Sequence, residues 1–271
     1  MRTFAILNMN ENMDISNNIL KHLPSDDKKY VFCPSDHKDF DCDTNTEVII
    51  LPEDILTHNT KLKNYVTKYF FDNGFKGFLH EIEDSVQIMK NPSVFLEKIE
   101  EMMSKLNQKS WLNTTCDGCN FIYAKYNPRL ILNVDEEDVK DVYNGQLAWC
   151  SNANTAWMCY NYDIADYDDV KFDETFDFPM FYIIKFLAMR RNMKKNGELY
   201  YMNLYPSIPA EMKTFRTIES PQKSKYYVDF TQEMVQKEDQ KFREMNIDTH
   251  PDSDFGKLIE DIHSILLSKK I

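Results

Sequence analysis

The first ninety residues alternate between short apolar runs and segments with a helical period. The short runs are bounded by proline or by polar clusters, which is typical of buried strands. In the segments between them, apolar residues recur every three or four positions, which predicts helices. The expected order is strand 3–8, helix 14–23, strands 30–33 and 47–51, helix 61–71 and strand 77–79. Strands alternating with helices predict an α/β fold, with a mostly parallel sheet flanked by helices.

The rest of the chain predicts further elements but a less regular order. Asn91-Pro92 places an N-cap residue before a proline, which predicts a helix start. The other expected elements are strands 111–115, 120–123, 129–134, 148–150, 155–160 and 200–205, and helices 178–191, 230–245 and 255–267. We therefore expect one domain over residues 1–228 and a helical C-terminal extension over residues 229–271.

The strand expected at 77–79 is followed by three carboxylates, Glu81, Glu83 and Asp84. Like charges this close repel one another unless a cation or a network of donors offsets them. Mg2+ takes oxygen ligands, often carboxylates together with substrate phosphates. Ligands of open α/β sheets also bind at the carboxyl ends of the strands. The pattern favours a metal-assisted nucleotide-phosphate site, and a solvated acidic turn is the alternative.

Asn73, Gly74 and Gly77 stand before the strand that ends in these acids. This arrangement resembles the nucleotide-diphospho-sugar glycosyltransferases of the GT-A fold, family 2, in which an Asn-x-Gly break and an apolar strand precede the metal-binding DXD motif. The chain departs from that motif in having Glu at both expected Asp positions, 81 and 83. The resemblance implies that Glu83 and Asp84 hold Mn2+ or Mg2+ on the diphosphate of a nucleotide-diphosphate sugar.

The same resemblance assigns the nucleoside of the donor to the ends of the first two strands. Asn8, Asn10 and Glu11 follow the first strand, and Asp36 follows the second. With Glu81 they form the expected nucleotide-sugar-binding set.

A second segment with this resemblance is Phe172-Asp173-Glu174-Thr175-Phe176, which in the family precedes a helix on the acceptor side. In many family members a Glu-Asp pair follows and includes the general base that takes the proton of the acceptor hydroxyl. Here that pair is missing, and Asp177 is the nearest carboxylate. Asp177 is therefore the candidate base. A retaining mechanism, or a base from elsewhere in the chain, remains the alternative.

Composition narrows the classes of function. The chain has 271 residues, a formal net charge of −12 and only 6 Gly, and it lacks the Gly-x-Gly-x-x-Gly and Gly-Lys-Ser/Thr patterns of Rossmann and P-loop proteins. The negative charge disfavours nonspecific binding to nucleic acid. We found no apolar run long enough to span a membrane and no signal-peptide pattern at the N-terminus, so we expect a cytoplasmic protein.

The acceptor of the expected transfer is left open by the sequence. A polysaccharide or glycolipid is the common acceptor in the family. A modified DNA base is another, because basic residues gather over 185–225 and could face a phosphate backbone. The function from a different class is a non-catalytic α/β domain that binds a partner. Cys116 and Cys119 have the spacing of a zinc or redox pair, and a tight turn with free thiols is their alternative.

Overall fold

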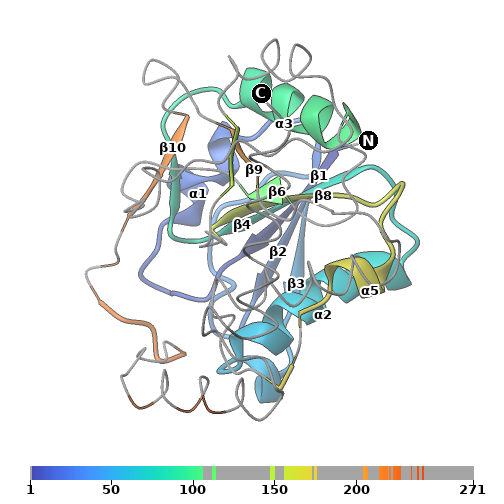
Figure 1. Cartoon of the computed structure of the whole chain (residues 1–271). Helices are drawn as coiled ribbons and strands as arrows, with labels where there is room; N and C mark the ends of the chain where they lie inside the picture. The colour runs from blue at the N-terminus through green and yellow to red at the C-terminus, as the bar shows by residue number, and fades with distance from the viewer. Residues whose placement is uncertain are drawn as a thin grey trace.

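The computed structural model describes residues 2–105 without a break, followed by shorter segments. The described segments beyond residue 105 are 112–113, 147–149, 156–172, 174–175, 204–206, 214–218, 220, 222–226, 233, 237 and 240. A six-stranded sheet in the order β3-β2-β1-β4-β8-β6 lies at the centre (Figure 1). Its first four strands are parallel, and helices lie on its faces. The predicted α/β class with a mostly parallel sheet is confirmed.

The parallel strands correspond to the four apolar runs of the sequence. They are β1 (Arg2–Leu7), β2 (Lys28–Cys33), β3 (Thr46–Ile50) and β4 (Phe78–Glu83). The two antiparallel strands of the same sheet are β8 (Trp157–Asn161) and β6 (Leu112–Asn113). β1 and β4 are buried along almost their whole length because strands pair on both of their edges and helices cover both of their faces. The edge strand β3 is the most exposed of the four.

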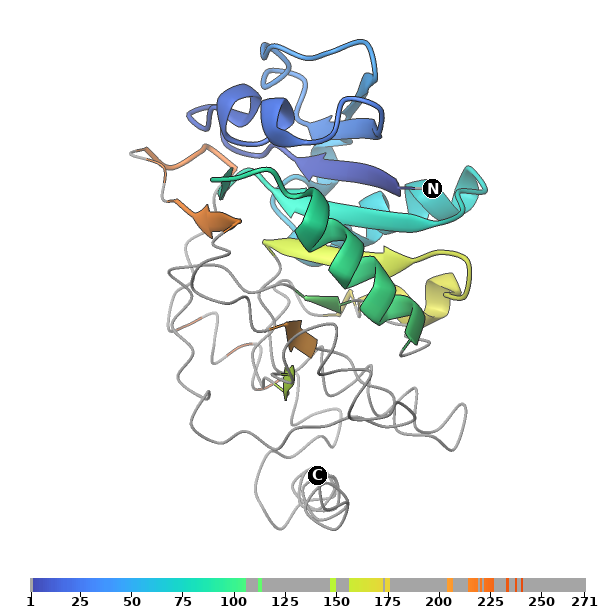
Figure 2. The same cartoon turned by 90° about the horizontal axis from the view of Figure 1, so that it is seen from above.

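Helices cover the sheet from two sides. The longer ones are α2 (Asn59–Asp72) and α3 (Ser93–Lys105), and the shorter ones are α1 (Ile15–Asn18), α5 (Tyr167–Val170) and the 3-10 turns η1 (Leu20–His22) and η2 (Glu53–Ile55). Neighbouring residues of β4 show that α2 and α3 lie on opposite faces. His80 contacts Glu100 of α3, whereas Glu81 contacts Lys63 of α2. Figure 1 shows the two helices on opposite sides of the strands, and Figure 2 shows α3 running across β4 and β8.

Aromatic side chains fill much of the core on the α2 face. Phe32 and Phe70 pack edge to face, with ring centroids 5.9 Å apart, and Phe71 lies 4.3 Å from Tyr162. Tyr162 donates a hydrogen bond through its hydroxyl to the backbone oxygen of Thr67 at 3.0 Å. These contacts tie β8 and the turn after it to α2, which holds that helix in place beside the carboxyl end of β4.

A two-stranded ribbon extends the molecule beyond the acidic end of β4. β5 (Val86–Ile88) pairs antiparallel with β10 (Phe215–Thr217), and the backbone N–H of Ile218 donates to the oxygen of Ser85 at 2.7 Å. A second ribbon pairs β7 (Leu147–Trp149) with β9 (Leu204–Pro206). The first ribbon is the one that matters for the site, because it brings the chain after Thr217 back to the carboxyl edge of the sheet.

Two local expectations need correction. The helix expected over 14–23 stops after one turn, because Asp14 caps it through Asn17 N but the backbone leaves the helical region at Ile19, and η1 follows. Two of the three acids expected after the 77–79 strand, Glu81 and Glu83, lie within the strand itself. β4 continues through Glu83, because Ala5 and Leu7 of β1 pair with Glu81 and Glu83.

Several other expectations agree with the structure or fall outside the described residues. Gly74 ends α2 with a φ of 65°, which glycine adopts without strain. The N–H of Ser93 donates to Asn91 Oδ1 at 2.9 Å, as expected for a helix start there. Other expected features lie outside the described residues. They are Asp177, Cys116, Cys119, the expected strands 120–123 and 129–134, and nearly all of the C-terminal extension. Among the described residues, every helix is too short or too polar to cross a membrane.

Candidate functional site

The strand order places a topological switch point between β1 and β4. From β1 the chain moves outward on one side to β2 and β3, and it then returns to the other side of β1 to form β4. In open α/β sheets, ligands bind outside the carboxyl ends of the strands at such a point, because the connections there diverge to opposite faces and leave a crevice. The carboxyl ends of β1 and β4 are therefore where a ligand is expected.

Asp84 joins the two strand ends at this point. One of its carboxylate oxygens, Oδ2, accepts hydrogen bonds from the backbone N–H groups of Met9 and Asn10, both at 2.7 Å. The backbone N–H of Asp84 in turn donates to the oxygen of Leu7 at 2.9 Å. Asp84 thus holds in place the residues that follow β1, called the β1 loop below.

Lys63 of α2 reaches the two glutamates of β4 from the side. Its ammonium lies 2.5 Å from Glu81 Oε1 and 2.9 Å from Glu83 Oε1. Glu81 is fully buried, and Tyr160 Oη donates a further hydrogen bond to it at 3.4 Å. Burial alone would lower the pKa of Lys63, but the charges of Glu81 and Glu83 outweigh that effect and raise it. Lys63 therefore stays protonated and offsets one of two negative charges.

The carboxyl group of Asp84 has a pKa well above its usual value, mainly because it is buried. Burial raises the pKa of its carboxyl group to about 7, against the effect of the two backbone hydrogen bonds, and the neighbouring charge of Glu83 adds to the rise. The cluster of Glu81, Glu83, Asp84 and Lys63, called the acid cluster below, carries more negative than positive charge when Asp84 is ionised. Three carboxylates this close together attract a cation.

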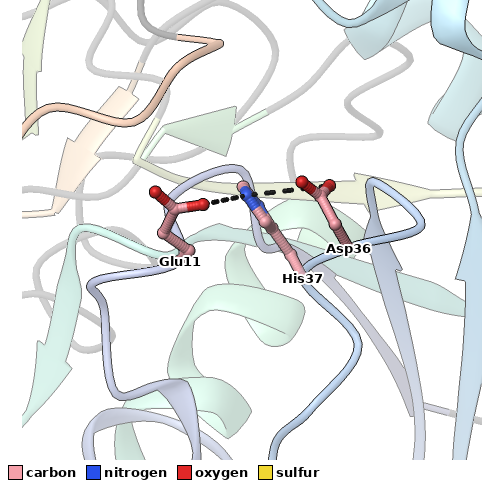
Figure 3. A group of neighbouring side chains, drawn as sticks. All are labelled: Glu11, Asp36 and His37. Carbon is pink, nitrogen blue, oxygen red and sulfur yellow. Dashed lines mark hydrogen bonds and ion pairs between the residues drawn. The ribbon is translucent and has the colours of Figure 1, made fainter.

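The ends of β1 and β2 bring together four of the five residues expected to bind the nucleotide sugar. Asn8 is buried at the end of β1, and its Nδ2 donates to the backbone oxygen of His37 at 3.1 Å. Asn10 and Glu11 lie in the turn after β1, and Asp36 lies in the turn after β2. Figure 3 shows Glu11 and Asp36 on either side of the His37 ring. The fifth residue, Glu81, lies in β4, where it is bonded to Lys63.

Residues 222–226, called the strap below, cross this edge of the sheet. Asn10 Nδ2 donates to the oxygen of Gln222 at 3.3 Å, and Ser224 Oγ donates to the oxygen of Met9 at 2.7 Å. Lys225 forms an ion pair with Asp36, and this contact lowers the pKa of the Asp36 carboxyl group. The basic stretch over 185–225 ends in the strap, which lies against the β1 and β2 ends.

The segment that precedes Asp177 is anchored beside the acid cluster. Asn64, the neighbour of Lys63 in α2, donates through Nδ2 to the backbone oxygen of Phe172 at 2.8 Å and to Glu174 Oε1 at 2.9 Å. Its Oδ1 accepts from the N–H of Phe172 at 2.7 Å. Asp177 itself lies outside the described residues, three positions after Glu174.

Sequence reasoning missed Lys63, Asn64 and His37. A signal for the first two is present, because the buried polar residues of α2 recur at helical spacing: Thr60, Lys63, Asn64 and Thr67. The apolar spacing of this helix predicts that its buried face consists of apolar residues. No comparable signal marks His37, since its position depends on a turn in which its N–H donates to the oxygen of Pro34.

The acid cluster has a donor set that suits a hard divalent cation. Glu83 and Asp84 offer carboxylate oxygens, which Mg2+ and Mn2+ prefer. A carboxylate accepts several bonds at once, so the contacts with Lys63 and with the β1 loop are compatible with such an ion. Among the described residues, the group whose potential ligand atoms lie closest together is a different one, Glu11, Asp36 and His37.

Comparison with known proteins gives distant structural matches only. No family model matches the chain, and no curated protein matches its sequence. Among solved structures, a crystal structure of S. aureus TarS is 13% identical, with a TM-score of 0.45, over 82% of this chain and 37% of that one. A structure of TarS 1–349 is 14% identical, with a TM-score of 0.45, over 80% of this chain and 60% of that one. The chain thus spans less than two thirds of either.

Proposed function

We propose that this chain is a glycosyltransferase that binds a nucleotide-diphosphate sugar at the carboxyl ends of β1, β2 and β4. The observation that carries the proposal is the position of Asp84. It ends the strand whose sequence resembles the metal-binding strand of the GT-A enzymes, and it bonds to the β1 loop across the switch point. Diphosphate chemistry at this crevice requires a positive counter-charge, and the acid cluster is built to attract one.

In this proposal each strand end has its own task. Asn8, Asn10, Glu11 and Asp36 contact the nucleoside, and Glu81 holds Lys63 in place beside the diphosphate. Glu83 and Asp84 would hold Mn2+ or Mg2+, which would stabilise charge on the departing diphosphate. The strap covers the nucleoside end, because its Ser224 and Lys225 already contact the β1 and β2 turns.

Asp177 is proposed as the general base for the acceptor hydroxyl. Support comes from the segment just before it, whose Phe172 and Glu174 are held on Asn64 next to Lys63. Three residues of extended chain reach roughly 10 Å, so the proposal requires the acceptor hydroxyl to bind within about that reach of Glu174. The acceptor is a saccharide, or a DNA base in a chain that modifies DNA. Most of the basic stretch that would face DNA lies outside the described residues.

One observation favours the non-catalytic alternative, an α/β domain that binds a partner. Each acid of the cluster already has a protein partner: Glu81 and Glu83 bond Lys63, and Asp84 bonds the β1 loop. An acid cluster satisfied in this way can be purely structural. The two functions differ in whether a nucleotide sugar binds together with a divalent cation.

A thermal-shift screen separates them. UDP-, GDP- and dTDP-sugars are each added with and without Mn2+ to the wild type and to Glu83→Ala. Ligand that binds the folded state alone raises the melting temperature. The proposal predicts a rise for one nucleotide that needs Mn2+ and disappears in Glu83→Ala. The absence of a shift with every donor in the wild type would favour the partner-binding domain.

A further inference from the structure

A second cluster of ligand-type side chains lies at the ends of β1 and β2, apart from the acid cluster. Glu11 comes from the turn after β1, and Asp36 and His37 come from the turn after β2. We propose that these three residues form a binding site for a transition-metal ion of the Zn2+ type, and that Lys225 of the strap competes with the ion for Asp36. Glu11 and Asp36 are also two of the proposed nucleoside contacts, so an ion and a nucleoside would compete for them, but metal binding is tested without the transfer reaction.

The distances suit coordination by one ion. His37 Nε2 lies 3.0 Å from Glu11 Oε2 and 3.9 Å from Asp36 Oδ1, and all three ligand atoms lie within 4.8 Å of one another. Ligands about 2.1 Å from a tetrahedral ion stand about 3.4 Å apart. Small rotations of the two carboxylates, whose side chains are 48% and 40% exposed, bring the oxygens to that spacing.

The imidazole of His37 is directed at the proposed site. Its side chain is fully buried, and Figure 3 shows it pointing between the two carboxylates. Its Nδ1 has no hydrogen-bond partner, and neither has Oδ1 of Asn8, whose Nδ2 bonds the backbone of His37. Among the described residues, these are two of only four buried side-chain polar atoms without a partner. Nδ1 lies across the ring from Nε2, so an ion on Nε2 would not satisfy it. What points to an ion is the position of Nε2, which lies close to both carboxylates.

The donor set selects the kind of metal. One imidazole nitrogen and two carboxylate oxygens suit Zn2+ and its neighbours among the transition metals, whereas Mg2+ prefers oxygen ligands and keeps several waters. The acid cluster offers oxygen ligands alone. The two clusters are therefore expected to differ in metal preference, which allows each to be tested in the presence of the other.

The strap places a positive charge against this cluster. Lys225 is ion-paired with Asp36, and the Tyr226 hydroxyl donates to Asp36 Oδ1 at 3.1 Å. The ring of Tyr226 lies 5.3 Å from that of His37. A metal ion on Asp36 would repel the Lys225 ammonium and displace it. Removing the charge of Lys225 should therefore strengthen metal binding, which a purely structural ion pair would not predict.

Isothermal titration of metal-free protein with Zn2+ tests the proposal. The background carries Cys116→Ser and Cys119→Ser so that this thiol pair does not contribute. The variants are Glu11→Gln, His37→Gln and Lys225→Met. Glu47→Gln is the control, because Glu47 is exposed and pairs with Tyr30 toward the other end of the sheet. Asp84→Asn reports on the acid cluster.

We expect one Zn2+ site in the background protein. Loss of a ligand in Glu11→Gln or His37→Gln should weaken it at least about tenfold, since even changes behind the ligands of a metal cost that much. Lys225→Met should tighten it about two- to fivefold, the range expected for loss of an exposed ion pair. Glu47→Gln and Asp84→Asn should leave it unchanged.

Unchanged Zn2+ affinity in both Glu11→Gln and His37→Gln would overturn the proposal. So would a site that is lost in Asp84→Asn and kept in Glu11→Gln, since the ion would then belong to the acid cluster. Glu11 is exposed, so its substitution tests the ligand role even if His37→Gln fails to fold. Binding of nucleotide sugars is measured separately, and a failure of that function leaves this result standing.

Discussion

Two charged clusters lie back to back on neighbouring residues of β4. His80 points to the α3 face and Glu81 to the α2 face, and both side chains are fully buried. The first cluster joins His80 to Glu100 and Arg2, and we call it the α3 cluster. The second is the acid cluster at the switch point. Because one strand carries both, the difference between them comes from their partners and their position along the strand.

The α3 cluster is closed. Trp157 Nε1 donates to His80 Nδ1 at 3.3 Å, so His80 carries its proton on Nε2 and donates to Glu100 at 3.0 Å. Arg2 binds Glu100 through two nitrogens, at 2.5 and 2.9 Å, and also reaches Asp27 at 3.5 Å. Both imidazole nitrogens and both carboxylate oxygens therefore have partners. Such a network holds α3 on the sheet and has no capacity left for a ligand.

The acid cluster combines three carboxylates with one ammonium group. One ammonium, that of Lys63, serves two glutamates, and Asp84 adds a third carboxylate at the strand end. Its position at the carboxyl end of β4 also brings it to the crevice between β1 and β4, whereas the α3 cluster lies under a helix. The comparison teaches that burial of charge alone does not identify a site. Several like charges gathered at the point where the strand connections diverge are the better indication of a site.

The largest effect is expected from removing Lys63. Lys63→Met leaves Glu81 buried without its cation, and breaking a buried ion pair in this way costs about 3 to 5 kcal/mol. Urea unfolding measures the loss. The double variant Lys63→Met/Glu81→Gln should regain much of it, because the uncompensated charge is gone.

Lys68→Ala is the matched control for Lys63. Lys68 lies on the same helix and pairs with Asp72, but both side chains are more than half exposed. Its removal should change stability by less than about 0.5 kcal/mol. If Lys63→Met proved as mild as this control, the acid cluster would not be buried as described.

The next effect concerns the α3 cluster and has a characteristic pH dependence. Burial alone would raise the pKa of Glu100, but the hydrogen bonds from His80 and Arg2 bring it down to about 2. A pKa lowered by folding adds stability above the unfolded value, about 4.3, and that stability is lost as the pH falls toward 2. Glu100→Gln should therefore cost about 2 to 3 kcal/mol at pH 7 and progressively less below about pH 4.

Unfolding curves at several pH values measure this difference. Glu101→Gln, on the exposed side of the same helix, is the control and should stay within about 0.5 kcal/mol of the wild type. His80 works in the same direction, since burial lowers its pKa and protonation in acid favours the unfolded chain. A cost of Glu100→Gln that did not depend on pH would contradict the closed, charged network.

A smaller effect of opposite sign is expected at Asp84. Folding raises the pKa of this carboxyl group to about 7, so its contribution to stability is present below about pH 4 and is lost as the pH rises to 7. Asp84→Asn removes that loss and keeps an oxygen that can accept the bonds from Met9 and Asn10. We expect the variant to be more stable than the wild type by about 1 to 2 kcal/mol at pH 8 and equal to it near pH 4.

The same set of unfolding curves tests Asp84→Asn. A gain in stability from replacing a site residue is the expected signature of a group kept for function at the expense of folding. Destabilisation at pH 8 would show instead that the ionised carboxylate is needed to hold the β1 loop, and the contrast between the two clusters would be weaker than described.

The sheet was predictable from the sequence because its strands are short apolar runs, and β1 and β4 are buried on both faces. Apolar runs that end at proline or at polar residues mark β1 to β4, and the helix expected over 61–71 lies within the longer α2, Asn59–Asp72. The helix expected over 14–23 was wrong in extent, because apolar spacing alone does not reveal the break at Ile19. The end of β4 was set too early, because Glu81 is polar in the sequence but is covered by neighbouring strands and paired with Lys63.

The site was predictable only in part. The carboxyl ends of parallel strands meet at one edge, so Asn8, Glu11, Asp36 and Asp84 could be grouped from the strand order alone. The residues that pair with these side chains, and so set their protonation, could not be predicted. A lysine in a helix, such as Lys63, is usually expected on a solvated face. Lys225 contacts Asp36 although it lies 189 positions away along the chain. Such contacts depend on the packing of the whole fold.

In our proposal the acid cluster binds a nucleotide sugar with a divalent cation, whereas the α3 cluster serves stability alone. The most direct measurement compares the Mn2+-dependent melting shift produced by the nucleotide sugar in Glu83→Gln and in Glu100→Gln. We predict that Glu83→Gln melts near the wild-type temperature and loses the shift, whereas Glu100→Gln melts lower and keeps it. A shift retained in Glu83→Gln, or lost in both variants, would contradict the account.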